Sequence, residues 1–212
     1  MKLNSYIDHT LLKADANPTQ IEKLCAEAIA YNFCAVCVNG SYVKLASDLL
    51  KNSDVKIASV IGFPLGASTT KTKVFEAKEC INNGANEIDM VLNIGMLKSG
   101  DYDAVSKDIS EVKKAIGAKT LKVILETCYL TNKEIKIASK LAMQAGTDFI
   151  KTSTGFGTGG ATIEDVKLMK EVVGDKVKIK ASGGIKNKQT AKAYINLGVC
   201  RIGTSSGIEI CS

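Results

Sequence analysis

Short runs of apolar residues alternate along the chain with longer segments whose apolar residues recur every three or four positions. The short runs are rich in Val and Ile, as buried parallel strands are. They predict eight strands, at residues 5–9, 34–39, 56–61, 87–93, 119–126, 149–153, 176–180 and 201–204. The segments between them are helical in period, and three end at Gly84, Gly146 and Gly198. Glycine at such a position commonly terminates a helix.

Strands that alternate with helices pair in parallel through right-handed crossovers, and eight such units close into a barrel. An open, doubly wound sheet is the alternative. We favour the TIM (β/α)8 barrel because the strands number eight and because no dinucleotide fingerprint follows the first. Polar residues also recur at the expected strand ends, which a barrel gathers at one mouth: Asp8, Asn39, Asn93, Glu126, Lys151, Ser153, Lys180 and Thr204. We expect a minimal single barrel domain over residues 1–212, with a very short eighth helix.

The composition excludes several classes of protein. A chain of 212 residues, 45% of them hydrophobic, can bury a core without disulfides or a structural metal. Its seven cysteines are odd in number and scattered through apolar segments, which together with the lack of a leader peptide predicts buried thiols in a cytoplasmic protein. The uncharged stretch at residues 57–70 contains a proline and is too short to span a membrane. His9 is the only histidine, so we expect neither a catalytic zinc site nor another cofactor.

The net charge is +6, and every basic residue except Arg201 is a lysine. Nucleic-acid sites usually combine arginines and aromatic residues in one basic patch, whereas these lysines alternate with Asp and Glu along helical stretches. We therefore expect a solvated surface that attracts anionic metabolites, without a nucleic-acid or membrane partner. An anion- or nucleic-acid-binding protein remains the non-enzymatic alternative.

Lys151 and Lys180 lie in apolar strands, unlike most lysines of this chain. Neighbouring strands of a parallel barrel are roughly 4.8 Å apart, so two inward-facing lysines at one height would be close neighbours. Each positive charge then lowers the pKa of the other lysine and favours a neutral amine. A neutral buried amine can form a Schiff base with a carbonyl substrate. The alternative is that both side chains point outward and extend to solvent.

Asp89 interrupts an otherwise apolar strand in the string NEIDMVLN. A buried carboxylate is costly unless it is paired or functional. Across the mouth from the two lysines, it could move protons to and from the intermediates of a Schiff-base reaction. Glu87 lies lower on the same face, where a salt bridge to a strand lysine is expected. Asp8 and Lys122 are assigned to a supporting network.

Glycine-rich loops follow the last three expected strands, in the strings TGFGTGG, SGG and GTSSG. Backbone N–H groups in such loops can approach an oxyanion closely, and the loops after strands seven and eight commonly bind phosphate in this fold. The strings supply Gly155, Gly183, Gly184, Gly203, Ser205 and Ser206 as phosphate-binding candidates, with Thr154 in the supporting network. Cys34 and Cys37 form a CxxC inside a strand, where buried thiols are expected. His9 is expected to contact a neighbouring carbonyl or carboxylate.

Eight strings carry a family resemblance: DHTLLK, the cysteine-containing second strand, VIGFPLG, NEIDMVLNIG, LKVILET, DFIKTSTGF, IKASGGI and RIGTSSG, in this order. Together they resemble the bacterial deoxyribose-phosphate aldolases over essentially the whole chain. The resemblance implies a metal-free class I aldolase that reversibly cleaves 2-deoxy-D-ribose 5-phosphate into D-glyceraldehyde 3-phosphate and acetaldehyde. It implies that Lys151 forms the Schiff base, that Asp89 donates or accepts protons, and that Lys180 handles protons and perturbs the pKa of Lys151.

The chain departs from the family pattern at three places. Some members carry a lysine where Phe156 stands, so phosphate binding here is expected to rest on backbone amides and hydroxyls. Longer members have an extra N-terminal helix, and some have a C-terminal tail with a tyrosine. We expect the gap beside the short last helix to be covered by another element, such as the partner subunit of a homodimer or homotetramer. Another phosphate-binding barrel aldolase or isomerase is the alternative function.

Overall fold

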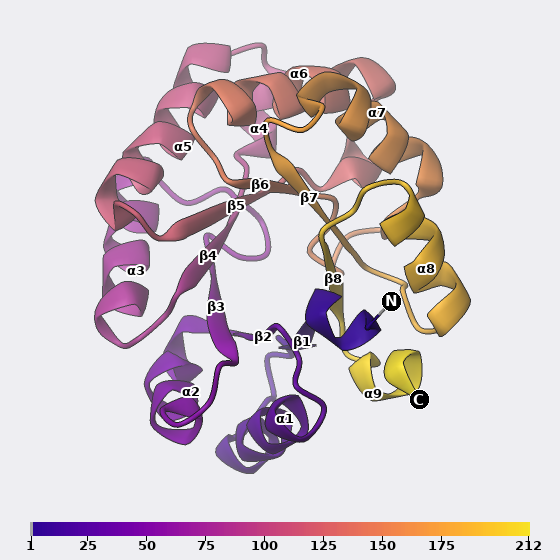
Figure 1. Ribbon diagram of the computed structural model, residues 1–212. Coiled ribbons are helices and arrows are strands. Elements are labelled where there is room, and N and C mark those ends of the chain that lie inside the picture. The colour runs from indigo at the N-terminus through magenta and orange to yellow at the C-terminus, as the bar shows by residue number, and fades with distance from the viewer. Residues whose placement is uncertain (1) are drawn as a thin grey trace.

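Eight parallel strands close into a barrel in the computed structural model, which describes residues 2–212. The strands follow one another around the barrel in chain order, and β8 pairs with β1 (Figure 1). Their bounds are β1 Ile7–Leu11, β2 Ala35–Val38, β3 Lys56–Ile61, β4 Glu87–Val91, β5 Thr120–Ile124, β6 Phe149–Lys151, β7 Lys178–Ser182 and β8 Arg201–Thr204. The prediction of a TIM barrel is confirmed.

Helices surround the strands as an outer layer (Figure 1). They are α1 Pro18–Ala30, α2 Val43–Leu50, α3 Thr70–Asn82, α4 Ile94–Lys98, α5 Tyr102–Ile116, α6 Asn132–Gln144, α7 Ile163–Val173, α8 Lys188–Asn196 and α9 Gly207–Cys211, with 3₁₀-helices at Leu3–Tyr6, Gly40–Tyr42 and Thr127–Tyr129. Several begin at a side chain that accepts a first-turn N–H, as Asn17 and Thr131 do within capping boxes. Gly84, Gly146 and Gly198 follow the ends of α3, α6 and α8 with positive φ, which confirms the predicted helix ends.

Two strands, β1 and β7, are shifted by two residues from the prediction, and β2, β4, β5 and β6 are shorter than predicted. Residues 5 and 6 belong to the 3₁₀-helix, in which the Ser5 hydroxyl donates to the Lys2 carbonyl, so β1 begins at Ile7. Lys176 still belongs to the turn after α7, because its N–H donates to the Val173 carbonyl, and β7 therefore begins and ends two residues later than predicted. As a result, Lys180 lies in the middle of β7 rather than at its end. Asp8 is likewise the second residue of β1.

Apolar packing fills the layer between strands and helices and leaves much of the barrel interior to charged residues. The main cluster joins inward-facing helix residues such as Ile21, Ile109 and Val166 to the outer faces of the strands. A small second cluster of Leu12, Cys37, Ala58 and Val60 lies apart from it. Branched apolar residues usually fill such an interior, so the buried charges here require an explanation in the site.

The helix α9 has five residues, as short as predicted. It packs against the 3₁₀-helix Leu3–Tyr6, and Leu3 and Ile210 are both buried there (Figure 1). The Lys188 ammonium at the start of α8 donates to the Ser212 carbonyl at 2.8 Å. The N-terminal segment of this chain is therefore one element that packs beside α9, and a covering partner subunit stays a prediction.

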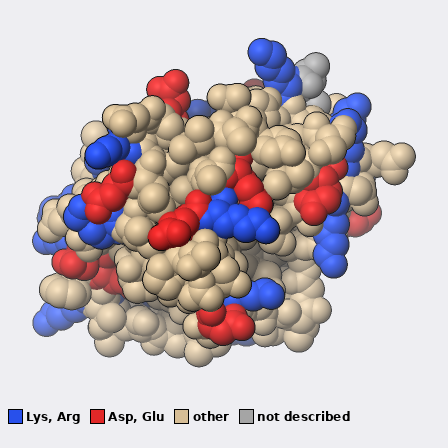
Figure 2. Space-filling model, turned by 90° about the horizontal axis from the view of Figure 1, so that it is seen from below, with Lys and Arg blue, Asp and Glu red and all other residues tan. Residues whose placement is uncertain are grey.

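The surface charge is mixed in sign on the face that Figure 2 shows, where lysines lie among aspartates and glutamates. No helix within residues 2–212 is long and apolar enough to cross a membrane.

Candidate active site

The strand register brings the predicted lysines and Asp89 together inside the barrel. Lys151 on β6 pairs with Lys180 on β7, and Asp89 on β4 pairs with Lys122 on β5. All four side chains point inward and are at most 3% exposed. The outward alternative for Lys151 and Lys180 is therefore wrong.

Asp89 accepts hydrogen bonds from the amino groups of three lysines. The Lys122 Nζ lies 2.6 Å from Oδ1, whereas the Lys180 and Lys151 Nζ atoms lie 2.8 and 3.0 Å from Oδ2. Charge-assisted bonds to a carboxylate are strong in a buried site. Asp89 thus holds the two predicted lysines at one oxygen atom.

A second set of contacts continues below Asp89. Lys180 also contacts Asp8 at 2.5 Å, and Lys122 contacts Glu87 at 2.6 Å, which confirms the predicted salt bridge of Glu87. Arg201 spans both carboxylates, with Nε 2.6 Å from Asp8 and a terminal nitrogen 2.7 Å from Glu87. The sequence reasoning missed this role of Arg201, although its being the only arginine among the basic residues was a signal.

The surroundings shift the pKa values of the two lysines in opposite directions. Burial lowers the pKa of Lys151, and the positive charge of Lys180 lowers it further, while Asp89 opposes both. The predicted direction is correct, but burial contributes more than the like charge. Burial also disfavours the charged form of Lys180, yet Asp8 and Asp89 together raise its pKa above the ordinary value. Lys151 is consequently the readier of the two to lose its proton.

The two aspartates are held in the ionised form. Burial alone would raise the pKa of Asp89, but Lys122, Lys180 and Lys151 hold it well below the ordinary value. The pKa of Asp8 is lowered in the same way, because Lys180 and Arg201 outweigh burial. These directions favour a counter-ion role for Asp89 over the proton transfer that the sequence suggested.

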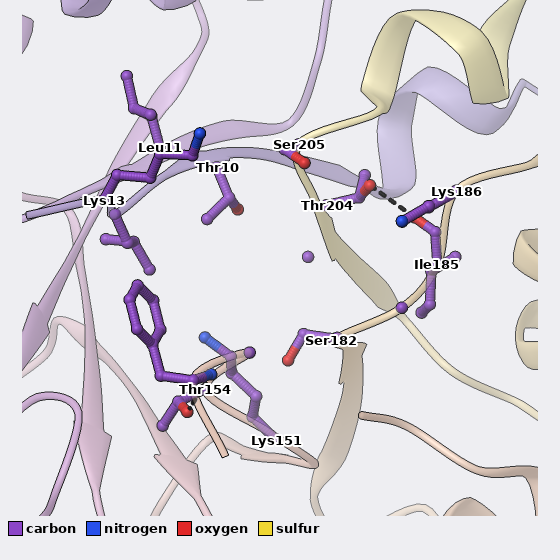
Figure 3. A pocket seen from close by; sticks show the side chains of 16 residues that line it. Thr10, Leu11, Lys13, Lys151, Thr154, Ser182, Ile185, Lys186, Thr204 and Ser205 are labelled. Carbon is purple, nitrogen blue, oxygen red and sulfur yellow. Dashed lines mark hydrogen bonds between the residues drawn. The ribbon is translucent and has the colours of Figure 1, made fainter. Parts of the chain in front are cut away.

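Lys151 lies at the bottom of a cavity of about 380 Å³ at the carboxyl ends of the strands, here called the mouth cavity. Figure 3 shows Lys151 and Ser182 pointing into it. Asp89 and Lys180 do not line the mouth cavity, in contrast to the prediction that all three groups face the mouth. The later start of β7 explains the difference for Lys180, because it sets this residue deeper in the barrel.

Most of the predicted phosphate-binding residues line the same cavity. They are Gly155, Gly183, Gly184, Gly203 and Ser205, accompanied by Ser182 and Thr204 (Figure 3). Ser206 does not line it and precedes α9, with its N–H donating to the Thr204 hydroxyl at 2.9 Å. Lys13 and Lys186 also line the cavity, and the sequence reasoning missed both because exposed lysines are numerous in this chain.

Two of the glycines are required by close packing. A Cβ atom at Gly203 would lie 3.0 Å from Cε of Lys180 and 2.9 Å from Cβ of Ser182. A Cβ atom at Gly183 would lie 2.8 Å from Cα of Gly160. Gly203 therefore makes room for the Lys180 side chain, and Gly183 lets two loops of the mouth touch through their backbones.

The loop after β6 forms one wall of the mouth cavity. The Thr154 hydroxyl and N–H both donate to Glu126, so Thr154 belongs to a local network separate from Asp89. Phe156 is 51% exposed, and its ring meets that of Phe63 edge to face at 5.3 Å between centroids. This wall is therefore apolar at the position where the resemblance suggested a lysine.

The remaining candidates take structural positions. His9 contacts Glu27 on α1 at 2.8 Å, which confirms its predicted carboxylate partner. Cys37 is buried with its sulfur 4.0 Å from Asp89, and burial raises the pKa of its thiol. Cys34 is half-buried, and burial raises the pKa of its thiol too. Within residues 2–212, no group of three or more His, Cys, Asp or Glu residues is arranged to hold a metal ion.

Comparisons with known proteins agree on one family. The family model described as DeoC/LacD family aldolase matches residues 3–212. The deoxyribose-phosphate aldolase of Finegoldia magna is 58% identical over 210 residues, which cover 99% of each chain. Among solved structures, the aldolase QR15 superposes with a TM-score of 0.96 at 44% identity, covering 100% of this chain and 95% of that one. The tetrameric deoxyribose phosphate aldolase of Aeropyrum pernix has a TM-score of 0.90 at 32% identity, covering 99% and 89%.

Proposed function

Since this chain belongs to the DeoC/LacD family of aldolases, and to the deoxyribose-phosphate aldolases within it, we propose that it reversibly cleaves 2-deoxy-D-ribose 5-phosphate through a Schiff base on Lys151. The products are D-glyceraldehyde 3-phosphate and acetaldehyde. One observation carries the proposal: Lys151 is the buried lysine of the site that faces the mouth cavity and has a lowered pKa. A neutral amine at the bottom of an open cavity is the nucleophile that this chemistry requires.

The first half of the reaction forms the iminium ion. The neutral amine of Lys151 attacks the C1 aldehyde of the open-chain sugar, and an N–H proton passes to the oxygen to give a carbinolamine. Lys180, which holds its proton firmly in the free enzyme, gives that proton through a water molecule to the departing hydroxyl. Water leaves, the iminium ion carries the positive charge, and Lys180 becomes neutral. Asp89, 3.0 Å from the Lys151 nitrogen, is the counter-ion of the new cation.

The second half breaks the carbon–carbon bond. Neutral Lys180 accepts the proton of the C3 hydroxyl through the water molecule, and the electrons of the C2–C3 bond move to the iminium ion. Glyceraldehyde 3-phosphate leaves, and an enamine remains on Lys151. Lys180 then returns the proton to C2. Hydrolysis of the resulting iminium ion releases acetaldehyde, and the proton set free in that step returns to Lys180 and restores the starting state. One proton thus moves between Lys180 and the substrate, and the total charge of the site stays constant.

The phosphate group is assigned to the polar side of the mouth cavity. Backbone N–H groups at Gly183 and Gly184 and the hydroxyl of Ser205 are the predicted donors, and their places along the mouth cavity support this role. Lys13 and Lys186 line the same cavity and supply positive charge near it. The apolar wall at Phe156 is not assigned to the phosphate. Its one donor is the Phe156 backbone N–H, which already donates to the Thr154 hydroxyl.

The test of the function is the cleavage assay combined with covalent trapping. Wild-type protein should release acetaldehyde from deoxyribose 5-phosphate, and borohydride added with substrate should leave a reduced adduct on Lys151, found by peptide mass spectrometry. Lys151→Met should lose both. Comparing acetaldehyde with dihydroxyacetone phosphate as the donor in synthesis separates this activity from that of other aldolases. An adduct on a different lysine, with Lys151 unmodified, would refute the assignment.

We also propose a cytoplasmic homo-oligomer, a dimer or a tetramer. The tetrameric aldolase of Aeropyrum pernix supports an assembly. Two large apolar side chains, Leu65 in the loop after β3 and Phe75 on α3, are more than 70% exposed, as residues at subunit contacts are before assembly. Light scattering after gel filtration gives the mass directly, and a single species of one-chain mass would refute the proposal.

A further inference from the structure

Six buried side chains form a closed ring in which carboxylates and cations alternate, here called the ion ring. In order they are Asp8, Arg201, Glu87, Lys122, Asp89 and Lys180. The N···O distances that join them lie between 2.5 and 2.8 Å. No member has a side chain more than 7% exposed. Solvent therefore screens these charges little, and the balance of charge within the ring matters.

The ion ring is electrically neutral when its members are ionised, because three carboxylates meet three cations. Lys151 is a seventh group with one contact to the ring, at the Asp89 oxygen that also accepts from Lys180. A proton on Lys151 would leave the buried cluster with one uncompensated positive charge, which is costly. The balanced state of the cluster is the one in which Lys151 is neutral.

We propose that Arg201 and Glu87 are positioning residues that keep the ion ring neutral and thereby leave Lys151 as the uncharged amine of the cluster. The inference deepens the proposed function and rests on it. Neither residue lines the mouth cavity. Arg201 instead lines a cavity of about 450 Å³ together with Lys178 and Cys200, at the amino ends of the strands. Its charge therefore acts on Lys151 from a distance, across the buried ring, and not by contact with the substrate.

Arginine suits this position for two physical reasons. Its planar guanidinium presents separate donors to Asp8 on β1 and to Glu87 on β4, which a single ammonium would have to share. It also stays protonated at any pH that the protein tolerates. The chain has 28 basic residues and places its one arginine here. The ring thus contains one cation whose charge is fixed.

Few titratable groups lie close to Lys151 and Arg201. Asp89 from β4, Lys180 from β7 and Cys37 from β2 lie around Lys151, and the Cys37 thiol stays protonated because burial raises its pKa. Asp8, Glu87 and Cys34 lie around Arg201. Lys56 reaches Glu87 from the outside at 4.0 Å, with a side chain 55% exposed. Solvent screens the charge of Lys56, which therefore contributes little to the charge balance of the ring.

The sign of the effect makes the inference testable. Arg201→Met removes one positive charge, so Lys151 should retain its proton to higher pH. The acidic limb of the profile of kcat/KM against pH should move up by about one unit, the size expected for a buried unit charge on the order of 10 Å away. Glu87→Gln removes one negative charge and should move the limb down by a similar amount. The double variant Glu87→Gln with Arg201→Met is balanced again and should return the limb to the wild-type position.

A second readout does not depend on catalysis. Trace acetic anhydride labels neutral amines, so competitive labelling of Lys151 at a series of pH values, followed by mass spectrometry, gives the pKa of Lys151 directly. Asp108→Asn is the matched control, because Asp108 pairs with buried Lys73 outside the barrel. It removes a buried charge from a separate pair and should leave the pKa of Lys151 unchanged.

Each outcome decides the question. Opposite shifts of the single variants with restoration in the double variant support the inference. Shifts in the same direction, no shift, or an equal shift in Asp108→Asn overturn it. If Arg201→Met does not fold, Glu87→Gln and the double variant still give the direction in which the pKa of Lys151 shifts. A wild-type protein without cleavage activity refutes the proposed function, whereas unmoved labelling in the variants refutes only the role of the ring.

Discussion

Replacing Asp89 with asparagine tests the counter-ion role most directly. The variant keeps the shape of the side chain but removes a negative charge that three lysines share, with Nζ distances of 2.6, 2.8 and 3.0 Å. The variant should favour the neutral amine, because Asp89 is the group that most raises the pKa of Lys151. The loss should therefore arise after the iminium cation has formed.

The size of the loss follows from the Lys151 contact. A unit negative charge 3.0 Å from the Lys151 nitrogen stabilises a cation there by about 5 kcal/mol at an effective dielectric constant near 20. The asparagine dipole retains part of this, which leaves about 4 kcal/mol, or roughly a thousandfold in kcat. The unfolding free energy should also fall, by about 3–5 kcal/mol, because buried cations lose a partner.

The assay measures glyceraldehyde 3-phosphate release by a coupled dehydrogenase reaction, with circular dichroism at the same temperature to confirm that the variant is folded. Asp108→Asn, which breaks a buried pair outside the barrel, is the control for lost stability. A folded Asp89→Asn enzyme with kcat within tenfold of wild type would refute the counter-ion reasoning. So would an acidic limb that moves to higher pH, because loss of Asp89 can only favour the neutral amine.

Three further predictions follow from the site. The pKa values of Asp8 and Asp89 are lowered in the folded protein. Their contribution to stability is therefore complete above about pH 4, the ordinary range of aspartate, and is lost as the pH falls below it. Midpoints of urea unfolding that stay constant from pH 6 to pH 3 would contradict this. Gly203→Ala should lower the free energy of unfolding by about 1–3 kcal/mol and should lower kcat more than it raises KM, because the added methyl group displaces Lys180. The control in the same denaturation and kinetic measurements is Gly95→Ala, whose Cβ would meet nothing closer than 3.6 Å. Phe156→Lys should raise kcat/KM for the phosphorylated substrate by about tenfold, the value of one charge-assisted contact, and leave that for unphosphorylated deoxyribose unchanged; equal gains for both substrates would show that the effect is not on phosphate.

The fold and the central residues could be predicted because lysine and aspartate are rare inside apolar strands. Lys151, Lys180 and Asp89 stand out for that reason. The boundary of β7 is wrong by two residues, yet the predicted direction of Lys180 is correct, since side chains alternate with a period of two and a shift of two preserves the face. Only the depth of Lys180 in the barrel changes.

The residues that sequence reasoning missed lack such a signal. Lys13 and Lys186 resemble the other exposed lysines, and their place at the mouth cavity depends on how the loops after β1 and β7 lie. Arg201 begins a strand, where a charged residue usually reaches solvent. Its contacts with Asp8 and Glu87 join residues more than 100 positions apart, and the pairing of distant residues is set by barrel closure. A single sequence, considered without related sequences, cannot reveal such pairs.

The charges of the ion ring, together with Lys151, are divided between the two halves of the chain by sign. Strands β1 and β4 carry the three carboxylates Asp8, Glu87 and Asp89, whereas β5 to β8 carry Lys122, Lys151, Lys180 and Arg201. Neither half can compensate its own interior charges, so a partly assembled barrel retains water around them until the other half arrives. The same charges that prepare Lys151 for chemistry thus delay collapse of either half alone and make their association sensitive to salt during folding.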